Sequence, residues 1–509
     1  MSVEVNPMPD IKAILSYYQI QAPSLRVNEL VLDSREVGVH SVFVAIPGHA
    51  LDGRDFIPQA ISLGAKMVLV HTDNMQQHGL IEMREQTVLV SFFKLAASLS
   101  ELAARFYGFP AEKLDVIAVT GTNGKTSTVQ LISQLRSLLG DGAASIGTLG
   151  AGMFNSDVSK LQKTLNTTPD ACQIQRLMAG FVTSQAQQVA FEASSHALVQ
   201  GRIEGLKTDV AVFTNLTRDH LDYHGSMQAY ATAKRRLLSQ PKLQQLVLNL
   251  DDQESQNWMA HAHAEQKVTV FSTKLSQQDV PAGAQYCLAN DIHFDDQGVT
   301  FTLDSSWGQA TIKSGLLGQF NVANLLAALS ALLVLGKPLS TLAPLCAQLR
   351  PVAGRMELFE KAQHGNMIVD YAHTPDALEQ ALVSARVHCA GNLICVFGCG
   401  GDRDQGKRAV MGEIANRLSN KVYLTTDNSR TEAPSAIVAD IISGIDDTQK
   451  IQVELDRKKA IQLAMANSVP GDLILIAGKG HETTQTIGNH CLPYDEREYV
   501  RTISVEDKQ

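Results

Sequence analysis

The clearest chemical signal in the sequence is a glycine-rich loop between a strand pattern and a helix pattern. Residues 116–126 read VIAVTGTNGKT, and apolar residues at helical spacing follow up to Gly140. Backbone N–H groups at such a helix start can surround phosphate oxygens, Lys125 can reach the terminal phosphates, and the Thr126 hydroxyl can hold Mg²⁺. The first glycine of the loop is Gly121, so the spacing departs from the common GxxxxGK[ST] motif. We therefore expect a phosphate-binding loop and an enzyme that uses ATP.

Two later runs place polar residues at the ends of apolar strand patterns. The run 189–196, VAFEASSH, brings Glu192 to a strand end, where a carboxylate suits Mg²⁺ but an ordinary solvated glutamate fits equally well. The run 213–224, FTNLTRDHLDYH, contains two histidines, two aspartates and an arginine directly after a strand pattern. This density of ionisable groups favours a functional role over a purely structural one.

Lysine and asparagine residues further along the chain allow two interpretations each. Lys234 lies ten residues after His224 on an expected helix, where it could equally be a surface lysine. The run 318–324, GQFNVAN, precedes an expected helix, and its asparagine amides could cap that helix or read an adenine edge. The residue types alone do not decide between these roles.

Composition limits the class of protein. The 509 residues are 44% apolar and 19% charged, which predicts a folded chain of two to four domains. A net charge of -9 argues against a surface that tracks nucleic acid or anionic lipid and favours small-molecule substrates. The apolar run 325–335 is shorter than the ~20 residues that span a bilayer, so we expect a buried helix and no membrane insertion.

The cellular compartment is predicted from the N-terminus and the cysteines. The first residues, MSVEVNPMPD, lack the basic start and apolar centre of a signal peptide. Seven cysteines without a CxxC pair are typical of reduced thiols in the cytoplasm. For Cys395 and Cys399, around one strand end, buried packing is favoured over metal binding.

Patterns of strands and helices predict an α/β protein with three consecutive segments. In the first, residues 1–110, short apolar strands alternate with helical patterns; the second, residues 111–349, begins with the strand before the phosphate-binding loop. In the third, residues 350–509, four apolar strands each end in a polar or glycine-rich turn: NMIVDYAHTP, NLICVFGCGGDRD, KVYLTTDNSR and DLILIAGKGHE. Alternating strands and helices predict a doubly wound parallel sheet with all four turns at one edge, where ligands bind.

Taken in order, the motifs resemble the Mur ligase family across essentially the whole chain. The runs that carry the resemblance are TGTNGKTS, FEASSH, TNLTRDHLDYHG, GQFNVANLLAA, PVAGRME, DYAHTPDAL, GCGGDRDQGKR and GKGHE. The resemblance implies an N-terminal domain that binds the UDP end of a substrate, a central P-loop ATPase domain with a parallel sheet, and a C-terminal Rossmann-like domain that brings an amino acid. Within the family, the chain resembles ligases that add 2,6-diaminopimelate to UDP-N-acetylmuramoyl-L-alanyl-D-glutamate in peptidoglycan precursor synthesis. Such an enzyme is expected to act as a monomer.

The resemblance also implies site residues, by motif. The UDP-substrate site would comprise Leu32, Ser34, His49, Ala50, Leu51, Asn166, Thr167, Thr168, Ser194, Gln200 and Arg202. The ATP site would comprise Gly121, Thr122, Asn123, Gly124, Lys125, Thr126, Ser127, Asn324, Arg355 and Asp370. The diaminopimelate site would comprise Arg403, Asp427, Asn428, Ser429, Arg430, Gly478 and Glu482.

Metal binding and catalysis follow from the same resemblance. Thr126 and Glu192 would hold one Mg²⁺, and His220 would help to hold a second. Lys234 would be carbamylated to N6-carboxylysine, which turns a cation into a carboxylate able to serve a metal site. With Lys125, these residues form the expected catalytic set.

One departure from the family pattern bears on selectivity. The motif DNPR reads here as DNSR, residues 427–430. Arg430 favours diaminopimelate over lysine, because guanidinium pairs bidentately with the second carboxylate that lysine lacks. Loss of the proline could cost about 0.4 to 1 kcal/mol through chain entropy, less than a tenfold change in affinity.

The expected reaction begins with transfer of the γ-phosphate of ATP to the free D-glutamyl carboxylate, which gives an acyl phosphate. An amine then displaces phosphate, and Glu482 or a water is a candidate to accept its proton. The closest alternatives are a lysine-adding relative or an enzyme similar to folylpolyglutamate synthetase. A P-loop switch or motor ATPase is a further alternative. It would not need the 213–224 run, and the sequence has no NKxD guanine motif.

Overall fold

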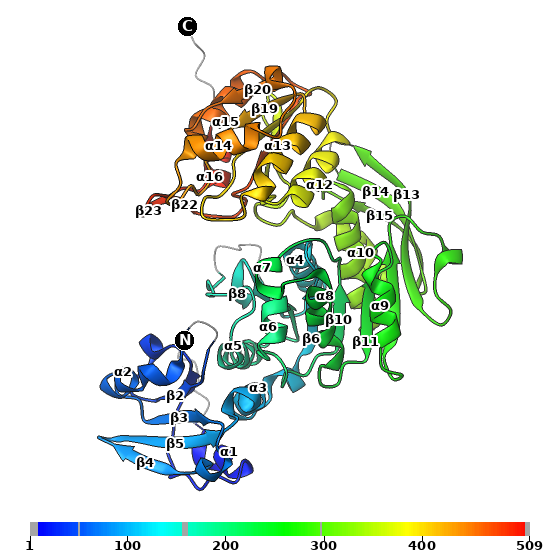
Figure 1. Ribbon diagram of the computed structural model, residues 1–509. Helices are drawn as coiled ribbons and strands as arrows, with labels where there is room; N and C mark the ends of the chain where they lie inside the picture. Colours follow the sequence, from blue (N-terminus) through cyan, green and yellow to red (C-terminus); the bar gives the residue numbers. More distant parts are fainter. Residues whose placement is uncertain (1–8, 49–50, 155–160, 296–297, 504–509) are drawn as a thin grey trace.

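The computed structural model describes residues 9–48, 51–154, 161–295 and 298–503. These residues form three large sheets, which follow one another along the chain, and a two-stranded hairpin near the C-terminus. In Figure 1 the N-terminal and C-terminal sheets lie on opposite sides of the middle one. The sheets fall inside the three segments expected from sequence, and the α/β class is confirmed. The segment boundaries themselves stay predictions.

The N-terminal sheet has the order β1-β2-β3-β5-β4, parallel except for the edge strand β4. Its strands are β1 (Glu29–Val31), β2 (Ser41–Ala45), β3 (Met67–Thr72), β4 (Ile81–Arg84) and β5 (Thr87–Phe93), and its helices are α1 (Ile11–Tyr17), α2 (Ile57–Ser62) and α3 (Leu95–Phe106). Buried Ala171 and Cys172 from the middle segment join the core on one face of this sheet. Arg176 also pairs with Glu29 at 2.8 Å, so the two segments share packing and charge contacts.

The middle sheet has the order β15-β14-β13-β12-β11-β10-β6-β9-β7-β8, with strands β13 to β7 of that order parallel. Its strands are β6 (Asp115–Thr120), β7 (Ala143–Gly147), β8 (Gly150–Met153), β9 (Gln188–Glu192), β10 (Val210–Phe213), β11 (Gln245–Asn249), β12 (Lys267–Ser272), β13 (Gln285–Asp295), β14 (Gly298–Ser305) and β15 (Gly308–Ser314). Its helices are α4 (Lys125–Leu138), α5 (Ala171–Thr183), α6 (Ser195–Val199), α7 (Leu221–His224), α8 (Met227–Arg235), α9 (Glu254–His261), α10 (Gln319–Val334) and α11 (Leu339–Leu345).

Alternation along β6 shows how this sheet separates two cores. Ile117 and Val119 pack with α4 and α10 on one face, whereas Val116 and Ala118 pack with α5 on the other. Successive side chains of a strand point to opposite faces, so a continuous apolar strand is buried on both. Helix α10 lies against α4 and the sheet, and most of its residues are buried. The prediction of a buried helix in this run is therefore confirmed.

The C-terminal sheet has the order β16-β17-β21-β18-β19-β20, and only the edge strand β16 among these six is antiparallel to its neighbour. Its strands are β16 (Glu357–Phe359), β17 (Asn366–Asp370), β18 (Leu393–Phe397), β19 (Lys421–Leu424), β20 (Ile451–Val453) and β21 (Leu473–Ala477). Its helices are α12 (Pro375–Arg386), α13 (Gly406–Leu418), α14 (Pro434–Ile442), α15 (Arg457–Ala466) and α16 (Glu496–Thr502), and the hairpin is β22 (Thr484–Ile487) with β23 (His490–Pro493).

This arrangement confirms that the four polar turns lie along one edge. Strands β17, β21, β18 and β19 are adjacent and parallel, so the turns after them are neighbours. Cys395 and Cys399 are both buried in this core, in agreement with a packing role. Within the described ranges, no helix combines the length and apolar character needed to cross a membrane.

Two leucines on helices of the middle segment provide a test of where its stability lies. Leu326 in α10 is fully buried, whereas Leu138 at the end of α4 is 37% exposed. We expect Leu326→Ala to lower the free energy of unfolding by about 2 to 5 kcal/mol through lost burial and a cavity, and Leu138→Ala by less than about 1 kcal/mol. Both tryptophans, Trp258 and Trp307, belong to this segment, so their fluorescence in urea follows its unfolding. Equal losses for the two variants would contradict the packing described.

Candidate functional site

The phosphate-binding loop joins the end of β6 to the start of α4. Gly121 has φ 150°, and a Cβ atom there would lie 1.9 Å from the Thr214 hydroxyl; Gly124 has φ 83°, and its Cβ would lie 2.4 Å from Asn324 Oδ1. Both positions therefore need glycine. Lys125 Nζ folds back and donates to the carbonyls of Gly121, at 2.9 Å, and Thr122, at 2.7 Å. Burial lowers the pKa of Lys125.

The segment that follows β10 contacts the loop from one side. Phe213 of β10 pairs in register with Thr120 of β6, so the segment after β10 lies beside the loop. Thr214 Oγ1 donates to the Asn123 carbonyl at 2.6 Å, and Asn215 Oδ1 accepts from the Asn123 backbone N–H at 2.9 Å. The run 213–224 was singled out from sequence, but this contact was missed because it depends on strand order.

Glu192 ends the strand on the other side of the loop and is buried, 1% exposed. Its Oε1 accepts from the Thr126 hydroxyl at 2.9 Å and from the Thr148 backbone N–H at 2.8 Å. The Thr148 hydroxyl is also 3.3 Å from Oε2 and 3.2 Å from the hydroxyl of Thr167. The structure thus brings Thr126 and Glu192 together and excludes the interpretation of Glu192 as a solvated surface residue. Thr148 was not identified from sequence, because no motif surrounds it.

Lys234 is buried, 1% exposed, beneath the loop, which excludes the surface-lysine interpretation. Its Nζ donates to the Gly121 carbonyl at 2.6 Å and lies 4.4 Å from the centre of the Tyr230 ring. Burial first, and then the charge of Lys125, lower the pKa of Lys234 well below its ordinary value. This environment favours the neutral amine.

Three histidines gather next to these lysines. The ring of His196 lies 5.0 Å from that of His220 and 5.6 Å from that of His224. Burial lowers the pKa of all three, that of His196 to about 4. Neutral imidazole can bind a metal ion or accept a proton.

In the described ranges no cluster contains three or more His, Cys, Asp or Glu side chains placed to hold a metal. Mg²⁺ retains water and phosphate ligands, so Thr126 and Glu192 fit a site completed by a nucleotide.

Three residues expected at the ATP site lie around the loop and the third sheet. Asn324 is buried in the first turns of α10, which begins at Gln319. The expectation that the run 318–324 precedes the helix was therefore wrong by several residues.

Burial raises the pKa of Asp370, whose carboxylate accepts from the backbone N–H groups of Met356 and Ala372, each at 2.8 Å. Arg355 lies over the Tyr371 ring at 4.5 Å, and its buried Nε has no hydrogen-bond partner. Asn123 Nδ2 donates to Asp376 Oδ2 at 3.0 Å, which ties the loop to α12.

The residues expected to hold the UDP substrate fall into two groups. In the N-terminal segment Ser34 donates to Gln59 at 2.7 Å, Leu32 packs against the core and Leu51 is exposed. His49 and Ala50 lie outside the described residues. In the middle segment Arg202 donates to the Thr168 carbonyl at 2.7 Å and to Gln200 at 2.6 Å, and Thr168 contacts Ser194 at 3.1 Å. Asn166 is exposed nearby.

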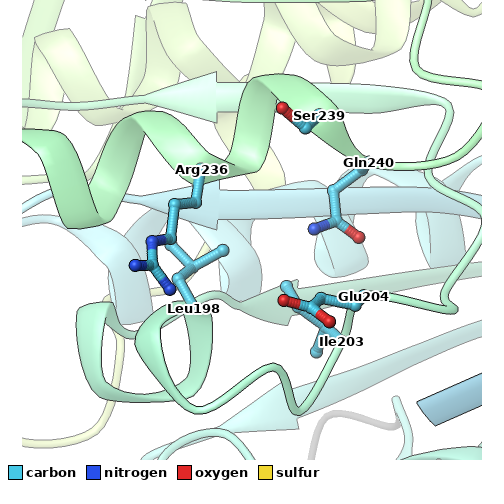
Figure 2. Close-up of a pocket in the computed structure, with 6 residues that line it drawn as sticks. All are labelled: Leu198, Ile203, Glu204, Arg236, Ser239 and Gln240. Carbon is cyan, nitrogen blue, oxygen red and sulfur yellow. The ribbon is translucent and has the colours of Figure 1, made fainter. Parts of the chain in front are cut away.

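A hollow of about 350 Å³ lies beyond the second group. Figure 2 shows its wall, formed by Leu198, Ile203, Glu204, Arg236, Ser239 and Gln240. An adjoining hollow of about 700 Å³ shares Arg236 and is lined by Tyr223 and His224, among others. None of the residues expected from sequence to bind a substrate lines either hollow.

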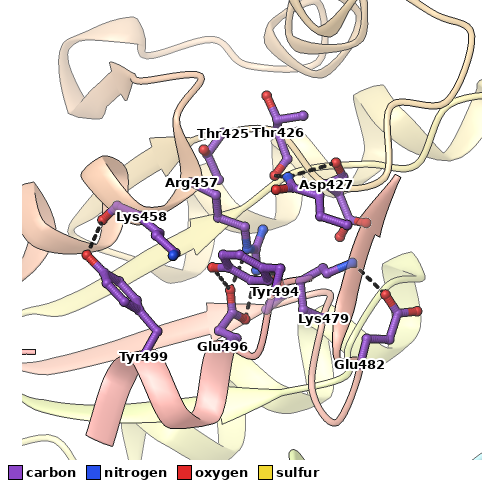
Figure 3. Close-up of polar contacts among 12 residues, drawn as sticks. Thr425, Thr426, Asp427, Arg457, Lys458, Lys479, Glu482, Tyr494, Glu496 and Tyr499 are labelled. Atoms are coloured by element: carbon purple, nitrogen blue, oxygen red, sulfur yellow. Dashed lines mark hydrogen bonds and ion pairs between the residues drawn. The ribbon is translucent and has the colours of Figure 1, made fainter. Parts of the chain in front are cut away.

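The residues expected to bind an amino acid lie in the polar turns of the C-terminal sheet. Asp427 is within reach of Gly478, where a Cβ would lie 2.6 Å from the carboxylate. Asn428 Nδ2 donates to Glu482 Oε2 at 3.0 Å. Figure 3 shows Asp427 and Glu482 in these neighbouring turns, with Lys479 between them. Arg403 is exposed in the turn after β18, whose Gly400 lies close to the Arg430 guanidinium.

The hairpin β22–β23 holds the DNSR turn. Arg430 N donates to the Thr486 carbonyl at 3.2 Å, and Gly488 N donates to the Arg430 carbonyl at 2.7 Å. Gln485 Nε2 donates to the carbonyls of residues 426, at 3.2 Å, and 427, at 3.1 Å. Ser429, which stands where the family pattern has proline, is 1% exposed. Hydrogen bonds from the hairpin therefore restrain a turn that lacks the stiffness of proline.

The fold and the site define an ATP-using enzyme with a P-loop sheet and a second, parallel sheet whose turns carry charged side chains. The sequence matches the Mur ligase family catalytic domain over residues 26–107, the Mur ligase middle domain over residues 119–332, and the Mur ligase glutamate ligase domain over residues 354–480. The chain belongs to the Mur ligase family, whose members are ATP-dependent, amide-bond-forming ligases.

Individual relatives share both sequence and fold with the chain. It is 44% identical over 480 residues to a UDP-N-acetylmuramoyl-L-alanyl-D-glutamate--2,6-diaminopimelate ligase from Vibrio cholerae, covering 94% of both chains. A solved structure of an enzyme with that name is 34% identical, with a TM-score of 0.68 and coverage of 97% of this chain and 98% of the other. MurF from Acinetobacter baumannii is 17% identical, with a TM-score of 0.65 and coverage of 93% and 96%, which shows likeness of fold alone.

The buried state of Lys234 predicts a pH-dependent effect on stability. Because the pKa of Lys234 is lowered in the folded chain, the unfolded chain binds a proton that the folded chain does not at pH values between this lowered pKa and about pH 10. Within that window, stability falls as pH falls. In bicarbonate-free buffer we expect Lys234→Met to raise the thermal midpoint more at about pH 7 than at about pH 10. Lys207→Met is the control, because Lys207 is paired with Asp209 at 2.6 Å and its removal should not raise the midpoint. An equal change for Lys234→Met at both pH values would contradict the description.

Proposed function

We propose that the chain is the ligase that adds meso-2,6-diaminopimelate to the D-glutamyl carboxylate of UDP-N-acetylmuramoyl-L-Ala-D-Glu, in the synthesis of peptidoglycan precursors. The carrying observation is that the loop at 121–126 and the turns at 427–430 and 478–482 occupy strand ends of two sheets, and that Asn123 in the loop contacts Asp376 in helix α12, which follows β17 of the second sheet. Ligands of parallel sheets bind at such strand ends. The relatives that share 44% identity carry the name of this ligase.

The proposal assigns one substrate to each segment. Residues 1–110 would bind the UDP end, residues 111–349 would bind ATP and the peptide end, and residues 350–509 would bring diaminopimelate. Arg430 would pair with the second carboxylate of diaminopimelate. The proposed enzyme works as a monomer in the cytoplasm on small-molecule substrates.

Lys125 and the loop N–H groups would orient the transferring phosphoryl group and offset its charge, which is the dominant contribution in such reactions. Attack by the D-glutamyl carboxylate on the γ-phosphorus would break the bond to ADP and give an acyl phosphate. The amine of diaminopimelate would then form the amide and release phosphate. Thr126, Glu192, His220 and carbamylated Lys234 would hold Mg²⁺, which supplies positive charge to the phosphate oxygens.

Carbamylation of Lys234 is supported by its surroundings. A carbamate forms from a neutral amine and CO₂, and burial favours that neutral amine here. Lys234 Nζ also lies within 2.6 Å of the Gly121 carbonyl, inside the phosphate-binding loop. A carboxylate at this position would place a negative charge where Mg²⁺ is needed.

The first test of the proposed function measures ADP release with UDP-N-acetylmuramoyl-L-Ala-D-Glu, Mg²⁺ and ATP, in the presence of meso-diaminopimelate, L-lysine or no amino acid. We expect release with diaminopimelate only, because Arg430 has no second carboxylate to pair with in lysine. Release with lysine as well would mean that the DNSR turn selects poorly. Release without any amino acid would overturn the ligase and indicate an ATPase switch.

A second test addresses the carboxylate on Lys234. We expect Lys234→Ala to lose at least about a hundredfold in kcat, a loss typical of removing a group that stabilises a transition state, and to regain part of it with added formate or acetate. The short acid would replace the missing carboxylate in the cavity left by the lysine. Lys207→Ala, with the same acids, controls for general salt effects. Unchanged activity in unrescued Lys234→Ala would refute the metal-support role.

A further inference from the structure

A buried lysine stands inside the proposed amino-acid site and has no role in the reaction described above. Lys479 follows Gly478 in the turn after β21, and its side chain is 0% exposed. A lysine is almost never fully buried unless its charge is paired. Figure 3 shows its side chain directed toward Glu482.

The ammonium group of Lys479 closes a triangle with two residues of the site. Its Nζ donates to Asn428 Oδ1 at 2.9 Å and to Glu482 Oε2 at 2.6 Å. The third side is the bond from Asn428 Nδ2 to the same Glu482 oxygen, at 3.0 Å. Lys479 therefore connects the turn after β19 to the turn after β21.

These contacts fix the orientation of both partners. Asn428 Oδ1 also accepts from the Thr486 backbone N–H at 2.8 Å, so the amide oxygen faces two donors and the amide nitrogen faces Glu482. The side chain of Glu482 is 30% exposed, whereas that of Lys479 is fully covered. Glu482 can therefore meet a ligand, and Lys479 acts on the ligand only through its partners.

The start of the same turn is anchored by a separate buried ion pair. Arg457 and Glu496 form a buried pair at 2.5 Å, and Arg457 also donates to the carbonyl of Ala477 at 2.8 Å. Tyr494 donates to Glu496 at 2.9 Å (Figure 3). Because Ala477 immediately precedes Gly478, the strand end is anchored independently of Lys479. Loss of Lys479 should then release Glu482 and Asn428 without releasing the strand.

We propose that Lys479 is a positioning residue that orients the Glu482 carboxylate and the Asn428 amide to receive the ammonium-bearing head of the incoming amino acid. This inference rests on the proposed function and deepens it. A purely stabilising role would predict that stability is the main loss when Lys479 is removed. Because Glu482 is partly exposed, water can solvate its carboxylate after that removal, so the positioning role predicts a loss of orientation instead.

The test is steady-state kinetics of Lys479→Met in the full chain, with each substrate varied in turn. We expect the KM for diaminopimelate to rise about tenfold or more, as for loss of a charge-assisted contact, and the KM values for ATP and the nucleotide-sugar peptide to change less than about threefold. Lys207→Met is the matched control, because Lys207 Nζ also contacts a carboxylate at 2.6 Å and a carbonyl at 2.9 Å, but in the middle segment. It should lower the thermal midpoint and leave the KM for diaminopimelate unchanged.

A double-mutant cycle with Glu482→Gln separates positioning from general damage. We expect the two substitutions together to cost clearly less in kcat/KM for diaminopimelate than the product of their separate effects, because Lys479 acts through Glu482. Equal changes in all three KM values, or multiplicative effects in the cycle, would overturn the inference. If Lys479→Met does not fold, Lys479→Gln is judged by the same criteria. Wild-type ADP release that ignores diaminopimelate would instead overturn the proposed function.

Discussion

The site depends on the convergence of two lysines on one backbone carbonyl. Lys125 and Lys234 both donate to the Gly121 carbonyl, at 2.9 and 2.6 Å. Two positive charges so close together in a buried place repel each other. Burial lowers the pKa of both lysines, and the charge of Lys125 lowers that of Lys234 further. Loss of the charge on one lysine, or binding of an anionic ligand, relieves this repulsion. A loop that binds phosphate and a lysine that reacts with CO₂ are both consistent with that electrostatic constraint.

Strand order supplies the geometry that this constraint requires. Strands β10, β6 and β9 are adjacent and parallel, so Thr214, the loop and Glu192 reach the same edge from three separate parts of the chain. The loop can approach Thr214 and Asn324 closely because Gly121 and Gly124 have no side chain. In the third sheet, β19 and β21 lie on either side of β18 and are parallel to it, so the turns at Asp427 and Gly478 reach the same edge and come into contact.

Much of this arrangement could be predicted from local sequence, because apolar strands followed by polar or glycine-rich turns have one favourable topology. The loop at 121–126, the buried α10 and the common edge of four turns were expected for that reason. Residues that act across strands could not be found in this way. Thr148 carries no motif, and Lys234 has the same sequence pattern as a surface lysine until tertiary packing buries it.

The DNSR turn illustrates how a local sequence argument can be correct and still incomplete. Replacing proline by serine does increase the freedom of the unfolded turn, which is a cost in chain entropy. The folded turn, however, is bound by the hairpin through Gln485 and Thr486 and by Lys479 through Asn428. Each such hydrogen bond contributes on the order of 0.5 to 1.5 kcal/mol net, so two of them offset the expected entropic cost. Arg430 therefore remains on a restrained backbone, and its position is determined by contacts distant in sequence rather than by the residue before it.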